Sequence, residues 1–103
     1  MLTRKDAIVE AQCLINELRS EGYSIDRSML FGSFVNETQH EHSDIDLALW
    51  DKHFSGCMAA DYEPIKHVLS KYPRIELHTF HQKDNRQTNP FVEVIEKQGV
   101  KLH

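Results

Sequence analysis

The sequence feature that most constrains the fold is a pair of aspartates at the start of an apolar run. Asp44 and Asp46 flank Ile45 and precede the apolar segment 47–50. Successive side chains of a strand point to opposite faces, so the two carboxylates share one face while Ile45 points to the other, into a core. The pattern predicts a buried strand over residues 45–50 with a carboxylate pair near its start.

Two carboxylates fixed side by side repel each other, and a divalent cation removes this repulsion. Mg²⁺ prefers oxygen ligands and leaves room for water and phosphate oxygens. The turn Gly32-Ser33 follows the apolar strand predicted over 28–31. It offers a phosphate an uncovered backbone N–H and a hydroxyl. We expect residues 34–43 to begin as a helical turn, whose N-terminus faces the phosphate, and to continue as a polar loop.

The helices are predicted from their caps and apolar spacing. Thr3 and Asp6 form a capping-box pattern before a helix that ends near Gly22. A second helix is expected over Asp61–Lys71, with Pro64 in its first turn.

The C-terminal part predicts a strand, a helix and an extended tail. Residues 74–80 alternate between polar and apolar side chains. Asn89 is a predicted cap of the last helix, with Pro90 in its first position and three residues on its buried side: Phe91, Val94 and Ile95. Gly99 ends this helix, and 100–102 extend beyond it. The order predicts an α/β (α+β) fold, a small mixed β-sheet with helices on one face. The length of 103 residues predicts a single domain over 1–103.

Strand parity selects a third carboxylate. If the apolar residues of 74–80 face the core, Glu76 and His78 emerge on the opposite face. That face carries Asp44 and Asp46 if the two strands are neighbours. Three acids from two strands can hold two divalent ions about 3.5–4 Å apart, an arrangement that suits phosphoryl displacement. Asp84 and Glu93 are the alternatives if this parity is wrong, and His78 is a candidate for substrate contact.

Composition excludes several classes of protein. The formal net charge of −4 and the absence of a basic run argue against direct binding of nucleic acid. Cys13 and Cys57 have neither disulfide-framework nor zinc-site spacing. No apolar run is typical of a membrane span or a signal peptide, so we expect a cytoplasmic protein.

At these residues the chain resembles a known family. Gly32-Ser33, ten further residues and Asp44-x-Asp46 are similar to the signature of the nucleotidyltransferase superfamily related to DNA polymerase beta. The short length, and the ending from Asn89 to Val100, resemble its minimal nucleotidyltransferase branch. Members of that branch are often the antitoxin half of a pair with a HEPN toxin.

The resemblance implies a nucleotidyltransferase fold and the transfer of AMP from ATP to a tyrosine of a HEPN toxin. It implies that Asp44, Asp46 and Glu76 bind two Mg²⁺ ions and carry the catalysis, and that Gly32 and Ser33 hold the β- and γ-phosphates. An assembly of several copies of the chain stays open.

The chain departs from the family after the Gly-Ser turn. Family members frequently carry an Arg and then a Gly there, whereas this chain has Phe34, Val35, Asn36 and Glu37. Family members also often have Asp at the position of Glu76. Arg74, Lys52 or a partner chain could supply the missing positive charge.

Other interpretations stay beside this one. His40-x-His42 could bind zinc, although no further ligand follows at a characteristic spacing. Trp50, Phe54 and Tyr62 could stack on a base, although core packing is commoner for such residues. The chain could neutralise a toxin by binding alone, or modify a small molecule as aminoglycoside nucleotidyltransferases do.

Overall fold

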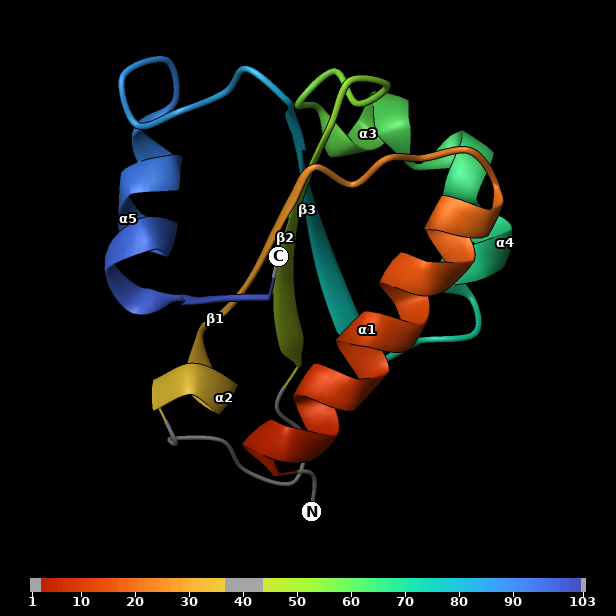
Figure 1. Cartoon of the computed structure of the whole chain (residues 1–103), viewed down its shortest axis with the longest axis horizontal. Coiled ribbons are helices and arrows are strands. Elements are labelled where there is room, and N and C mark those ends of the chain that lie inside the picture. Colours follow the sequence, from red (N-terminus) through yellow and green to blue (C-terminus); the bar gives the residue numbers. More distant parts are fainter. Residues whose placement is uncertain (1–2, 37–43, 103) are drawn as a thin grey trace.

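The fold is built on one mixed four-stranded sheet, seen nearly edge-on in Figure 1. The computed structural model describes residues 3–36 and 44–102. The strands are β1 (Arg27–Phe31), β2 (Ile45–Asp51), β3 (Ile75–His81) and β4 (Val100–Lys101), in the order β3-β2-β1-β4. β1 is antiparallel to β2 and β4, whereas β2 and β3 are parallel. The mixed sheet and the α/β class are as predicted.

The first face of the sheet carries the larger core. It is covered by α1 (Arg4–Ser20) and by the segment α3 (Met58–Asp61), η1 (Glu63–Ile65) and α4 (Lys66–Leu69) (Figure 1). Alternate residues of β2 and β3 are buried there, among them Ile45, Leu47, Leu49, Ile75 and Leu77. Hydrophobic burial therefore fixes the parity of both strands, and with it the face on which the acids emerge.

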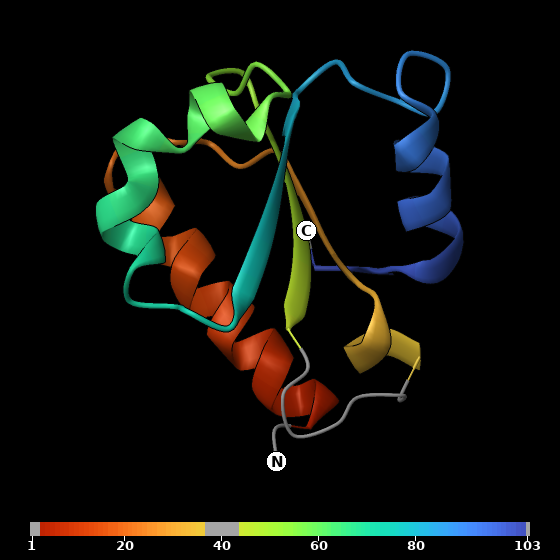
Figure 2. The ribbon, with the colours of Figure 1, turned by 180° about the vertical axis from the view of Figure 1, so that it is seen from behind.

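The second face is covered by α5 (Pro90–Gln98), which lies on the opposite side of the sheet from α1 (Figures 1 and 2). Its core includes Ala48, Trp50, Phe80, Val92 and Ile95. Helices on a single face were predicted, and α5 corrects that detail. The physical reason is that, beyond Asp46, β2 is buried on both faces, so both faces need a cover.

The helix ends follow the predicted caps with one exception. Thr3 and Asp6 form the capping box of α1, and the Asn89 side chain accepts a hydrogen bond from the Phe91 N–H at the start of α5. The helix expected over Asp61–Lys71 instead begins at Met58 and is broken into α3, η1 and α4. Pro64 lies in the 3₁₀ turn, where its missing N–H cannot continue a hydrogen-bonded helix.

The buried side of α5 is formed by Val92 and Ile95. Phe91 and Val94, which were also expected there, are 38% and 43% exposed. No helix among the described residues is long and apolar enough to cross a membrane.

Candidate metal and nucleotide site

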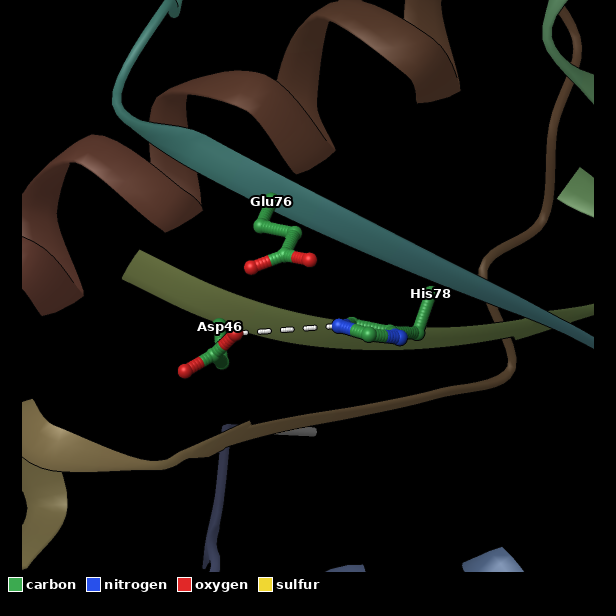
Figure 3. A group of neighbouring side chains, drawn as sticks. All are labelled: Asp46, Glu76 and His78. Atoms are coloured by element: carbon green, nitrogen blue, oxygen red, sulfur yellow. Dashed lines mark ion pairs between the residues drawn. The ribbon is translucent and has the colours of Figure 1, made fainter. Parts of the chain in front are cut away.

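The candidate site begins with two carboxylates on adjacent parallel strands. Asp46 of β2 and Glu76 of β3 are partners in the register and emerge on the same face (Figure 3). Neighbouring strands lie about 4.8 Å apart, so the side chains are direct neighbours. The strand adjacency and the parity predicted for Glu76 are both present in the structure.

Gly32 lies directly against Asp46. Its φ is +81°, a conformation that favours glycine, and a Cβ added there would lie 2.1 Å from Oδ2 of Asp46. No side chain fits between the turn and the carboxylate. Gly32 therefore lets the backbone approach the acid, and Ser33 follows as the first residue of α2 (Ser33–Asn36).

His78 completes a group of three side chains. One ligand atom each from Asp46, Glu76 and His78 lies within 4.8 Å of the others. The imidazole Nε2 points toward Asp46 and lies 3.7 Å from its Oδ1 (Figure 3). Asp44 is exposed just before β2 and is not a member of this group.

The electrostatics of the group reflect the crowding of negative charge. Burial raises the pKa of Glu76 above its ordinary value, and the hydrogen bond and negative charge of Asp46 raise it further. Nearby His78 lowers the pKa of Glu76, and Asp44 raises it. A proton or a cation is thus favoured between the two carboxylates. This donor set, with carboxylates gathered on one rigid face, fits a divalent metal ion.

Of the two cationic candidates, only Arg74 lies at the same end of the sheet as the acids. Arg74 directly precedes β3 and its carbonyl accepts a hydrogen bond from the Ile45 N–H. Lys52 follows β2, six residues beyond Asp46, which places it roughly 20 Å away at 3.3 Å per residue. Lys52 is therefore unsuited to contact a phosphate at the site.

The alternative acids lie elsewhere. Asp84 accepts a hydrogen bond from the His81 N–H at the far end of β3, and Glu93 pairs with Lys97 on α5. Trp50 and Phe54 are buried, whereas Tyr62 is exposed. His40 and His42 lie outside the described residues.

Two buried acids were not identified from the sequence. Asp51 accepts hydrogen bonds from the Ser24 and Ile25 N–H groups and from His53, and Asp61 accepts them from Ser55, Gly56 and Thr79. Each carboxylate joins a loop to the sheet. The sequence signals for these residues are weak: Asp51 is an acid at the end of an apolar strand, and Asp61 is an acid shortly before Pro64. Both patterns are common in surface loops as well.

A surface depression of ≈ 330 Å³ is lined by Glu21, Gly22, Tyr23 and His53. Because His53 follows the end of β2, this depression lies at the opposite end from Asp46. It is separate from the carboxylate group.

Comparison with known proteins bears on the fold and on the family of the chain. A solved structure described as "Crystal structure of the toxin-antitoxin with AMP-PNP" has a similar fold, with a TM-score of 0.64 and 24% sequence identity. The similarity covers 91% of this chain and 72% of that chain. A search of curated proteins finds no significant match. The family described as "Polymerase beta, Nucleotidyltransferase" matches residues 12–100. This chain therefore belongs to the polymerase beta nucleotidyltransferase family.

Proposed function

We propose that the chain is a Mg²⁺-dependent nucleotidyltransferase that moves AMP from ATP to a hydroxyl of a partner protein. The observation that carries this proposal is the Asp46–Glu76 pair, fixed on adjacent strands against the side-chain-free turn at Gly32. The match to the nucleotidyltransferase family supports the reaction class.

Asp44, Asp46 and Glu76 would hold the metal, as two ions. Bound Mg²⁺ would neutralise negative charge on the phosphates as it develops. Gly32 leaves its backbone open to the triphosphate, and the Ser33 hydroxyl and N–H would donate hydrogen bonds to the β- and γ-phosphates. In this scheme Arg74, exposed at the same end of the sheet, would add the positive charge.

The transfer balances simply. The acceptor oxygen forms a bond with the α-phosphorus, the bond from that phosphorus to the bridging oxygen breaks, and pyrophosphate leaves. Glu76, beside the metal position, would accept the acceptor's proton. The remaining contribution of the protein is positioning and electrostatic stabilisation.

The proposed acceptor is a tyrosine of a HEPN-type toxin, which makes this chain the antitoxin. The similar fold of a toxin-antitoxin with AMP-PNP supports the choice of a toxin partner and an adenine nucleotide. The resemblance of the Gly32 to Asp46 region to minimal nucleotidyltransferases supports the HEPN class and the tyrosine.

The proposal is tested by label transfer. The chain is incubated with Mg²⁺, the toxin encoded beside it and ATP labelled at the α- or the γ-phosphate. Label should reach the toxin from the α position alone, and Asp46→Asn should abolish it. Transfer of γ-label would indicate a kinase, and transfer of neither label would contradict the proposal.

Neutralisation by binding alone is the second candidate. The sequence favours it at one place, because residues 34–37 lack the Arg and Gly that family members frequently carry after Gly-Ser. In that case the toxin would be inhibited with no label attached.

A further inference from the structure

His78 has a buried ring nitrogen, Nε2, that forms no hydrogen bond within the described part of the chain. The 3.7 Å separation from Oδ1 of Asp46 is too long for a hydrogen bond. A buried polar atom left unpaired costs about 1–3 kcal/mol, so its retention on the carboxylate face calls for a ligand.

The imidazole ring is held in this orientation by aromatic neighbours. The ring centroids of His78 and Phe31 lie 5.1 Å apart, and those of His78 and Phe91 lie 5.7 Å apart. The His78 side chain is only 27% exposed. Packing therefore directs Nε2 toward the acids and away from solvent (Figure 3).

The separations within the group suit a shared cation. Two ligand atoms that each lie about 2.1 Å from one ion are about 3.0 Å apart when they occupy adjacent positions of an octahedron, and about 4.2 Å apart when they occupy opposite positions. The 3.7 Å between Nε2 of His78 and Oδ1 of Asp46 falls in this range. Glu76 lies beside them, since one ligand atom from each of the three residues lies within 4.8 Å of the others.

We propose that His78 Nε2 is a metal ligand, and that Asp46, Glu76 and His78 form a mixed carboxylate–imidazole site for a first-row transition-metal dication. Imidazole suits Zn²⁺, Co²⁺ or Ni²⁺, whereas Mg²⁺ favours oxygen ligands alone. The inference deepens the metal site of the proposed function and rests on the placement of metal there. It adds a nitrogen ligand and a preference among cations.

The test measures metal binding without nucleotide or acceptor, so that it is independent of AMP transfer. Zn²⁺ and Mg²⁺ are titrated separately by calorimetry into the full chain. The Zn²⁺ form is then examined by NMR with ¹⁵N-labelled histidine. His78→Gln is compared with His81→Gln, which changes a histidine of the same strand on the opposite face.

We expect Zn²⁺ to shift the Nε2 resonance of His78 to the value of a metal-bound imidazole. His78→Gln should weaken Zn²⁺ binding by about tenfold or more and change Mg²⁺ affinity by less than about threefold, because only the nitrogen ligand is lost. His81→Gln should bind both ions as wild type does.

Three results would overturn the inference: no Zn²⁺ binding by the wild-type chain, binding without a shift at His78, or unchanged Zn²⁺ affinity in His78→Gln. A His40→Gln, His42→Gln variant identifies binding in that sequence segment instead. If His78→Gln does not fold, the shift of the His78 Nε2 resonance on Zn²⁺ binding to the wild-type chain decides whether His78 is a ligand. Metal binding with no AMP transfer would contradict the proposed function and leave this inference intact.

Discussion

Substitution of Gly32 by alanine should show whether the open turn at Gly32 is needed for metal binding, separately from its effect on stability. Gly32 has a φ of +81°, and the left-handed region costs a residue with a Cβ about 1–2 kcal/mol. A domain of this length loses about 4–8 °C of Tm per kcal/mol. The backbone cost alone should therefore lower the Tm of Gly32→Ala by about 4–16 °C.

A matched control is present in the same chain. Gly22 has a φ of +105°, and a Cβ added there meets nothing within 4 Å. At Gly32 the added Cβ would lie 2.1 Å from Oδ2 and 3.0 Å from Cγ of Asp46. The carboxylate can rotate away for about 0.5–1.5 kcal/mol, so the two variants should differ in stability by no more than about that amount.

Metal binding should distinguish the two variants clearly. Rotation of the Asp46 carboxylate moves a proposed ligand away from Glu76. The affinity for Mg²⁺ with ATP should fall by about 10–100-fold in Gly32→Ala, the loss typical when the orientation of a ligand is disturbed. Gly22→Ala should bind as wild type does.

The assays are thermal unfolding without metal and calorimetry with Mg²⁺ and ATP. Wild-type affinity in Gly32→Ala would refute the reasoning, because the turn would then not constrain Asp46. An equal loss of affinity in Gly22→Ala would attribute the effect to general destabilisation.

Other consequences of the structure are open to measurement. The pKa of Glu76 is raised in the folded chain, so the stability that its neutral form provides at low pH is lost as the pH rises. In denaturant titrations without metal, the free energy of unfolding of Glu76→Gln should equal that of wild type near pH 4 and exceed it by up to about 1 kcal/mol at pH 7. A variant less stable than wild type at pH 7 would contradict this. Burial alone would raise the pKa of Asp51, but hydrogen bonds lower it, so its stabilisation is present above about pH 4 and lost in acid. Asp51→Asn should lose about 2 kcal/mol at pH 7 and show a flatter acid unfolding curve, and an unchanged curve would count against the assignment. Val92→Ala should cost about 2 kcal/mol and exposed Val94→Ala less than about 0.5 kcal/mol by the same titration, and equal costs would argue against α5 covering the second face.

The sequence predicted the carboxylate face because its signals are local. Successive side chains of a strand point to opposite faces, so Asp46 and Glu76 emerge on the face opposite to Ile45 and Ile75, whose burial enforces that choice. The capping residues Thr3 and Asn89 likewise act on their own helices. Gly32 and Asp46 approach each other because β1 and β2 pair directly, a contact consistent with the expected turn.

The features that were missed depend on contacts far apart in the chain. Local periodicity could not tell that α5 covers the second face, since Trp50 and Phe80 acquire a common cover only once the sheet forms. Asp61 was expected at the start of a helix but is the last residue of α3, where its carboxylate accepts hydrogen bonds from Ser55 of the preceding loop and from Thr79 of β3. The helix α5 has apolar residues on several of its sides, so its sequence alone does not determine which side is buried.

The most direct test of the proposed nucleotidyl transfer is the mass of the toxin after incubation with this chain, ATP and Mg²⁺. We expect an increase of about 329 Da for each AMP transferred, with loss of toxin activity. The Asp44→Asn, Asp46→Asn variant should remain folded, because neither side chain is in the core, and should leave the toxin unmodified and active. An unchanged mass, with neutralisation that the double variant retains, would contradict enzymatic transfer and indicate neutralisation by binding.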